Sequence, residues 1–271
     1  MKKIVFISLA LLLGVFSAKA QCIPTKPGAL PYSTGENLSY VLSYKWNAVN
    51  TDVATASLKL DTLRYNGNLV YYSRMTARTK AFFDTFFKAR EDFRSWFAMD
   101  TGRPLKYTRN TLEGKYTATN TYLYNWASRK IRATWKMGSK PQQTADLPLT
   151  DCTYDLPSII YFLRRMDTSN LKEGKSYKVT YGIDDDVYTI SLTFKGRENK
   201  KIRGIGKVKC LHFGCNVVAG EMFTGNEDAQ LWVSDDDNHI PIYFMAPLKV
   251  GAVTGRLSGY KGLSHKLATV K

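Results

Sequence analysis

The sequence lacks the short motifs that identify most classes of enzyme and metal-binding protein. It contains no H-E-x-x-H pattern, no G-x-S-x-G pattern and no phosphate-binding glycine loop, and only three histidines are present. The four cysteines show no C-x-x-C spacing, which argues against a zinc site. We therefore expect no metal, no cofactor and no catalytic centre defined by a motif.

Long apolar runs are absent after the N-terminus. Residues 1–20 begin with two lysines after Met1, continue with an apolar run over 4–16 and end with an A-x-A pattern at Ala20, which is the order of a secretory signal peptide. We expect cleavage after Ala20 and a periplasmic or secreted product. No later stretch reaches the roughly 18 apolar residues of a membrane span, so we expect no transmembrane segment. A lipid-anchored product at Cys22 is the alternative.

Acidic residues are few relative to basic ones. The chain has 39 Lys and Arg against 23 Asp and Glu, a net charge of +16. Loss of residues 1–20 would remove three lysines and no acid, which leaves +13. Such a field attracts anionic partners. Outside the cytoplasm these are lipid, lipopolysaccharide or acidic glycan, and nucleic acid is not expected.

The cysteines allow a disulfide framework if the chain is exported. Cys22, Cys152, Cys210 and Cys215 can pair fully in three ways, and the sequence does not select one. Cys210 and Cys215 would point to opposite faces of one strand, so we expect at least one disulfide between separate segments, such as Cys22 to Cys152. The alternative is four buried thiols, because a chain of this length can fold without disulfides.

Short segments rich in Tyr, Val, Thr and Trp alternate with turn residues from Glu36 onward. Asn66-Gly67 and Glu113-Gly114 are typical of tight turns between antiparallel strands. The pattern predicts a mainly β fold, in which a curved antiparallel sheet forms an open or partly closed β-barrel with two short helices. We expect one domain over 21–260, with two β halves that meet near 138–150, and a frayed tail over 261–271. The predicted strands are 37–46, 55–65, 69–77, 92–99, 105–111, 116–125, 130–136, 176–183, 187–196, 206–217, 229–234, 239–245 and 249–257.

Two segments break the strand pattern. In "TYDLPSIIYFLRRMD", Asp155 is placed to cap a helix, Pro157 falls in its first turn, and Arg164 and Arg165 suit the negative end of the helix dipole.

The second segment, "KAFFDTFFKAR", places four phenylalanines on one side of a helical turn between Lys80 and Lys88. It is interpreted either as a plug helix that closes the end of the β core, or as an exposed aromatic surface that enters a membrane or grips acyl chains. The predicted ligand-binding residues are Phe82, Phe83, Phe86 and Phe87 for apolar contact, with Lys80, Lys88 and Arg90 for an anionic head group.

The stretch "LWVSDDDNHIP" places acidic residues and a histidine between two predicted strands. Asp and Asn favour hairpin connections, so we expect a turn. A calcium loop would need a glycine at its bend and a distal glutamate, and neither is present. The enzymatic alternative is a hydrolase in which Asp235 and His239 act as acid and base.

Five blocks resemble the exported bacterial family known as domain of unknown function 3108. They are "GENLSYVLSY", "EDFRSWFAMDTGRPLKY", "YDLPSIIYFLR", "LWVSDDDNHIPIYF" and "LKVGAVTGRLSGY", in family order over nearly the whole expected mature chain. The resemblance implies an envelope protein of Gram-negative bacteria with a curved antiparallel sheet, and it transfers no catalytic residues. A weaker likeness is to periplasmic lipoprotein and lipid carriers, in which short helices close a half-open barrel.

These observations favour a non-enzymatic binding or carrier protein that holds an apolar or amphipathic anionic ligand in a barrel mouth. One alternative is an envelope hydrolase that acts on glycan or peptide. Another is a structural protein of an envelope assembly, which would bind protein partners through an exposed sheet edge.

Overall fold

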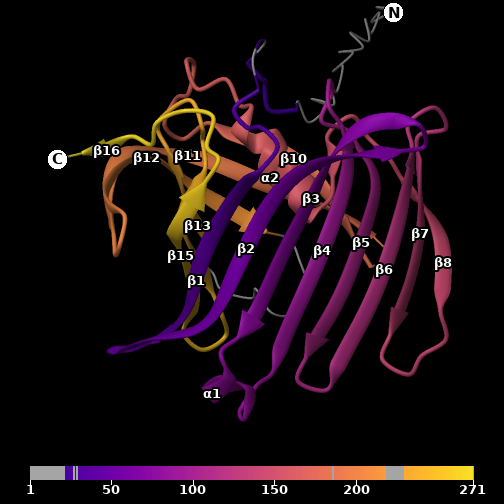
Figure 1. The fold of residues 1–271 in the computed structure, drawn as a ribbon, viewed down its shortest axis with the longest axis horizontal. Helices are drawn as coiled ribbons and strands as arrows, with labels where there is room; N and C mark the ends of the chain where they lie inside the picture. The colour runs from indigo at the N-terminus through magenta and orange to yellow at the C-terminus, as the bar shows by residue number, and fades with distance from the viewer. Residues whose placement is uncertain (1–21, 27, 29, 185, 218–228, 271) are drawn as a thin grey trace, which may run out of the picture.

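The structure is a computed structural model that describes residues 22–26, 28, 30–184, 186–217 and 229–270. The predicted signal peptide lies outside the described residues. The described chain forms sixteen strands and two helices (Figure 1). In chain order they are β1 (Glu36–Trp46), β2 (Val49–Tyr65), β3 (Asn68–Thr79), α1 (Ala81–Asp84), β4 (Ala89–Ala98), β5 (Pro104–Glu113), β6 (Tyr116–Asn125), β7 (Lys130–Met137), β8 (Gln143–Pro148), β9 (Thr153–Tyr154), α2 (Leu156–Arg164), β10 (Ser176–Ile183), β11 (Asp186–Ile202), β12 (Gly206–Val217), β13 (Ala229–Ser234), β14 (Pro241–Pro247), β15 (Ala252–Lys261) and β16 (Thr269–Val270).

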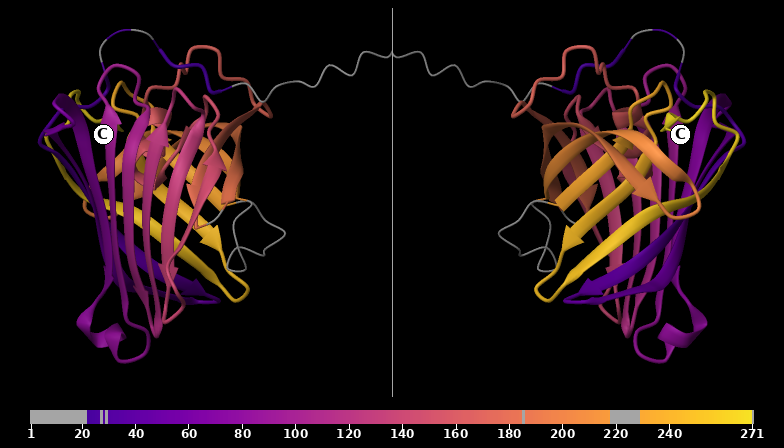
Figure 2. Two further views of the ribbon diagram at one scale, coloured as in Figure 1. Left: turned by 90° about the vertical axis from the view of Figure 1, so that its right-hand side faces the viewer. Right: turned by 90° about the vertical axis from the view of Figure 1, so that its left-hand side faces the viewer.

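All the strands belong to one sheet. Its order is β8-β7-β6-β5-β4-β3-β2-β1-β15-β14-β13-β12-β11-β10-β9, and β16 pairs with β12 beside this path. Every pairing is antiparallel except β9 with β10. The sheet curls until the β10–β13 strands lie across from the β2–β5 strands, but its edges β8 and β9 do not join (Figures 1 and 2). The predicted mainly β, barrel-like fold is confirmed.

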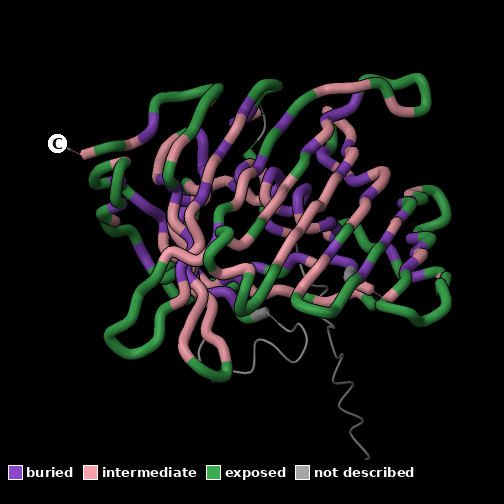
Figure 3. The backbone as a smooth tube through the Cα atoms, turned by 60° about the horizontal axis from the view of Figure 1, so that its bottom comes forward, coloured by how far each residue is buried: buried purple, intermediate pink, exposed green. Residues whose placement is uncertain are grey.

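Alternating side chains explain why the strands form and which face is buried. In β7, Ile131, Ala133 and Trp135 are buried while Lys130 and Arg132 are exposed, so one face meets the core and the other meets water. The turns supply the required backbone geometry. Asn66 and Gly67 both have positive φ, 51° and 82°, as the tight turn between β2 and β3 needs. Figure 3 shows the resulting pattern, with buried strand segments inside and exposed turns at the two ends.

Helix α2 lies inside the curl at the end opposite α1 (Figure 1). The Asp155 side chain accepts a hydrogen bond from the Ser158 backbone N–H, and the Ser158 hydroxyl accepts one from the Asp155 N–H. This reciprocal cap satisfies helix donors that would otherwise be buried without partners. The predicted N-cap is therefore present, and α2 closes this end of the barrel.

Three expectations differ from the structure. The Phe-rich segment forms only one helical turn, and none of its residues is buried, so its interpretation as a plug helix is wrong. Part of the polar segment expected to separate two β halves forms the edge strand β8, and the arms β1–β8 and β9–β15 join through the pairing of β1 with β15. The segment expected to fray is docked, because Leu267 is buried in the core and Thr269–Val270 pairs with β12.

Candidate functional site

A cavity of about 320 Å³ lies inside the barrel, between α2 and the two facing arms of the sheet. This volume is near the lower end of the range for small-molecule pockets, roughly 300 to 1,000 Å³. Most of its lining is hydrocarbon. The apolar side chains are Leu42, Ala56, Leu58, Met75, Ala77 and Phe93 from one arm, Ile160, Leu163 and Met166 from α2 and the segment just after it, and Leu192, Phe213, Leu231, Val233, Pro241 and Phe244 from the other arm.

Few polar side chains reach this cavity. Ser57, Arg164 and His239 are among its lining residues, as is the ring of Tyr40. The Tyr40 hydroxyl donates to the Pro241 carbonyl at 3.0 Å, so its polar atom already has a partner. The cavity therefore suits the hydrocarbon part of a ligand far better than a charged part.

Arg164, at the end of α2, is buried together with its counter-ion. Its Nη1 and Nη2 atoms donate to the two carboxylate oxygens of Glu36 at 2.5 and 2.7 Å, and the two side chains are only 1% and 0% exposed. The remaining donors reach the Asn238 carbonyl at 2.9 Å and the Pro31 carbonyl at 3.0 Å. This bidentate pair cancels the charge beside the cavity. Arg164 is thus not available to bind an anionic ligand.

The acidic stretch before β14 is a turn that is hydrogen-bonded to the C-terminal segment. The Asp236 carboxylate accepts hydrogen bonds from the backbone N–H groups of Asn238 at 2.9 Å and Ala268 at 2.7 Å. Asn238 exchanges hydrogen bonds with the backbone of His265. His239 adopts a positive φ of 47°, which fits a turn. These bonds join the turn to the C-terminal segment.

Asp235 and His239, the pair proposed for hydrolysis, have separate partners. Asp235 accepts a hydrogen bond from Arg197 Nε at 3.2 Å. His239 Nδ1 donates to the Arg164 carbonyl at 2.8 Å, because a carbonyl can only accept. Among the residues that the structure describes, no hydrogen bond joins the two side chains, and no group of three or more His, Cys, Asp or Glu could hold a metal ion.

The predicted ligand-binding residues lie apart from the cavity. Phe82, Phe86 and Phe87 are 69%, 77% and 54% exposed on and beside α1, and the half-buried Phe83 packs edge-on against Phe82. Lys80 and Arg90 line a separate polar hollow next to α1, and Arg90 is paired there with Asp84. The structure therefore brings these residues together with one another, but not with the apolar cavity.

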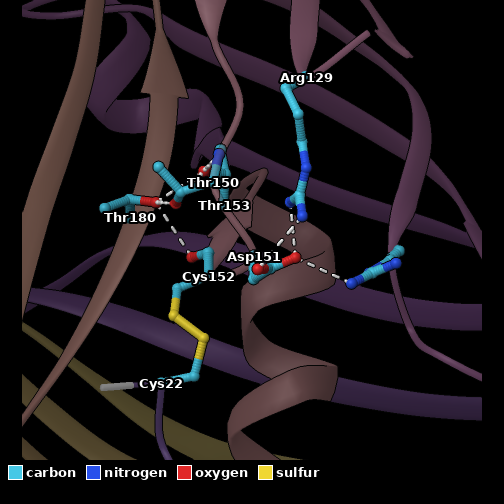
Figure 4. The surroundings of a disulfide bond; sticks show 8 residues. Cys22, Arg129, Thr150, Asp151, Cys152, Thr153 and Thr180 are labelled. Atoms are coloured by element: carbon cyan, nitrogen blue, oxygen red, sulfur yellow. Dashed lines mark hydrogen bonds and ion pairs between the residues drawn. A yellow bond between two sulfur atoms is a disulfide. The ribbon is translucent and has the colours of Figure 1, made fainter. Parts of the chain in front are cut away.

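A disulfide joins Cys22 to Cys152, with 5.4 Å between their Cα atoms (Figure 4). It links the N-terminal arm to the segment just before α2. Asp151 beside it binds Arg129 at 2.6 Å and Arg103 at 3.0 Å. Cys210 and Cys215 are buried and lie outside this disulfide, and burial raises the pKa of the Cys210 thiol to about 12.

One buried and one half-buried carboxyl group inside the barrel have raised pKa values. Burial raises the pKa of Asp155 to about 7, against the opposing effect of its hydrogen bonds from Ser158 and Ser95. Burial also raises the pKa of Glu91 to about 7, although Thr111 donates a hydrogen bond to it at 2.6 Å. Both groups can therefore exchange a proton near neutral pH.

Sequence reasoning missed the cavity and the buried ion pair. The lining residues are ordinary apolar members of strands that lie far apart in the sequence, so no local signal marks them. Glu36 could have been noticed, because it begins a strand whose next buried residue is Leu38 and so falls on the inward face. A charged residue on an inward face requires a partner, and α2 offers Arg164.

The fold and cavity define a class: an incompletely closed, antiparallel β-barrel-like protein with an apolar interior closed at one end by a helix. The chain belongs to the DUF3108 family, described as a protein of unknown function, whose family model matches residues 39–258. The family expected from the sequence is thereby confirmed. No curated protein matches the chain.

A solved structure with a related fold is a beta-barrel-like protein of the domain of unknown function DUF1849 from Brucella abortus. It matches with a TM-score of 0.53 at 10% identity, over 87% of this chain and 100% of that chain. At this identity the similarity concerns the fold alone. Among the described residues, no helix has both the length and the apolar character needed to cross a membrane.

Proposed function

We propose that this protein is a non-enzymatic binding or carrier protein that holds the apolar part of a hydrophobic or amphipathic ligand inside its barrel. The observation that carries the proposal is the cavity of about 320 Å³ with its nearly continuous hydrocarbon lining. Small-molecule sites are commonly apolar with a few fixed polar groups. The binding site is then the interior, and the exposed phenylalanines of α1 are not part of it.

The buried ion pair supports an apolar tail as the bound group. Glu36 neutralises Arg164, so a carboxylate or phosphate placed in the cavity would lose its hydration without gaining a free counter-charge. An amphipathic ligand would therefore leave its head group outside. The excess of basic side chains, which leaves a net charge of +13 after loss of residues 1–20, favours an anionic head group in that position.

We also propose that the protein works outside the cytoplasm, in the periplasm or after secretion. The signal-peptide pattern over residues 1–20 motivates this location. The Cys22–Cys152 disulfide supports it, because such bonds persist in oxidising compartments.

A cavity-filling substitution tests the binding site. Ala77 is half-buried and lines the cavity, so Ala77→Phe should occupy space that the ligand needs. Titration with the uncharged fluorescent probe N-phenyl-1-naphthylamine should show at least tenfold weaker binding than in the parent protein. Ala127→Phe adds the same side chain at an exposed turn and should bind like the parent.

Two results would contradict the proposal. One is a parent protein that binds no apolar probe and yields no lipid when it is analysed by native mass spectrometry. The other is binding that Ala77→Phe leaves unchanged, since the probe would then occupy another site.

A further inference from the structure

Exposed apolar side chains gather at one end of the barrel, the end that carries α1. The strand pairings place several connections at this end, among them β1–β2, β3–α1–β4, β5–β6 and β14–β15. We call the turns 46–49, 80–88, 113–116 and 248–251 the α1 rim. Of the ten large apolar residues that the described part of the chain exposes, seven belong to the α1 rim. They are Trp46, Val49, Phe82, Phe86, Phe87, Tyr116 and Val250.

The exposed phenylalanines are held in place by their own segment. Asp84 accepts hydrogen bonds from Arg90 and Thr79, and the Thr85 hydroxyl donates to the Phe82 carbonyl at 2.8 Å. These bonds fix the turn, and the exposed rings of Phe82 and Phe86 lie 5.7 Å apart, measured between their centroids. The α1 hairpin extends beyond the neighbouring strand ends (Figures 1 and 2). The apolar tip is therefore a formed feature of the fold.

A second turn continues this tip. Gly114 donates its backbone N–H to the Lys88 carbonyl at 2.8 Å, which holds the β5–β6 turn against the α1 connection. That turn adds Tyr116, which is 39% exposed. The apolar surface thus spans more than one hairpin, and it exceeds what isolated exposed residues normally form.

The charges on the α1 rim are mostly positive and unpaired. Lys45, Lys80, Lys88, Lys115 and Lys249 are exposed on or next to its turns, and none forms an ion pair with a described residue. Two carboxylates belong to the α1 rim: Asp84 is paired with Arg90, and Glu113 lies two residues before Lys115 in the sequence. Apolar tips surrounded by free lysines fit a surface that offers hydrocarbon behind a layer of negative charge.

From this arrangement we infer that the α1 rim docks the protein onto a lipid bilayer that carries anionic head groups. The phenylalanines enter the boundary between head groups and acyl chains, and the lysines bind the head groups. A bilayer fits better than a protein partner because the apolar groups come from separate protruding turns, which a fluid surface can accept without a matching shape. This inference does not depend on the cavity or its ligand.

Vesicle flotation with purified protein tests the docking surface. The parent protein should bind vesicles of phosphatidylglycerol and phosphatidylcholine at least tenfold more tightly than vesicles of phosphatidylcholine alone, and added salt should weaken that binding. The double variant Phe82→Ser/Phe86→Ser should lose at least tenfold in affinity. Its matched control, Leu69→Ser/Tyr260→Ser, removes two exposed apolar residues elsewhere and should bind like the parent.

Charge reversal gives an independent measurement. Lys80→Glu/Lys88→Glu should abolish the preference for anionic vesicles, while Lys172→Glu/Lys261→Glu, with the same change in net charge away from the α1 rim, should reduce it only slightly. Emission from Trp46 should shift to shorter wavelength on binding, and Trp46→Phe should lose that shift. Every protein in the series begins at the same residue, so the N-terminal segment contributes equally.

The melting temperature of each variant establishes that it is folded, which is expected because the replaced side chains are exposed. The inference is overturned if the parent does not bind anionic vesicles. It is also overturned if the two sets of variants lose affinity equally, because the α1 rim would then have no special part in binding.

Discussion

The two ends of the barrel carry segments of similar composition in opposite environments. Both α1 and α2 contain aromatic residues and are followed by cationic ones, yet Phe162 of α2 is 6% exposed while Phe86 after α1 is 77% exposed. Helix α2 has nine residues, a side-chain cap and a buried counter-ion for its arginine, and α1 has four residues and no side-chain cap. The difference teaches that spacing of apolar residues indicates a possible helix face, whereas caps and partners from distant strands decide whether that face is buried.

The largest difference in stability that we expect between the two ends concerns their ion pairs. Arg164→Met leaves the Glu36 carboxylate buried without its partner, so we expect a loss of about 3 to 5 kcal/mol in the free energy of unfolding. Arg90→Met breaks the partly exposed pair with Asp84 at the α1 end and should change the urea midpoint far less. Urea unfolding followed by circular dichroism measures both.

A double variant tests whether such a loss of stability comes from the buried charge that is left unpaired. Replacing both partners, as in Glu36→Leu/Arg164→Met, should recover much of the stability, because no uncompensated charge remains. If Arg164→Met alone has no measurable effect, the ion pair does not hold the α2 end in place.

Replacement by alanine should lower stability much more at a buried phenylalanine than at an exposed one. Phe162 stacks on Tyr154 with 4.1 Å between ring centroids, and Phe162→Ala should cost about 3 to 5 kcal/mol through the cavity that it leaves. Phe86→Ala should change stability by no more than about 0.5 kcal/mol. If thermal unfolding shows that Phe162→Ala and Phe86→Ala lose equal stability, the distinction between the two ends is contradicted.

The pH dependence of stability should also originate at the α2 end. Asp155 has a pKa raised to about 7 in the folded protein and a lower, ordinary value when unfolded, so the folded state holds more protons between these values. Its favourable contribution is present below the unfolded pKa and is lost as pH rises through about 7. We expect the free energy of unfolding to fall by about 2 kcal/mol between pH 5 and pH 7 on account of this group.

Asp155→Asn isolates this effect, because asparagine also caps helices but does not titrate. The variant should show a flatter stability profile between pH 5 and pH 8, with Glu91 contributing a similar slope to both proteins. Identical slopes in the variant and the parent, measured by urea unfolding at each pH, would exclude Asp155 as the source.

Local sequence signals were enough to predict much of the fold but little of the candidate site. The cap at Asp155 and the turn at Asn66-Gly67 depend on neighbouring residues, and both were predictable. Strand β8 was missed because an edge strand exposed on one side tolerates the polar residues that normally indicate a loop. The Glu36–Arg164 pair spans 128 residues, so its burial depends on how the sheet closes, which no local pattern records.

The position of β1 has a consequence for the order in which the chain can fold. β1 is the first strand of the described residues but lies in the interior of the sheet, between β2 and β15, and its residue Leu38 pairs with Tyr260 in β15. One edge of β1 therefore stays open until the last long strand is available. During synthesis or translocation this edge is a template for wrong pairing, and such exposed strands favour aggregation. A chain shortened before β15 would retain that open edge permanently, so it should accumulate as aggregate rather than as a smaller folded barrel.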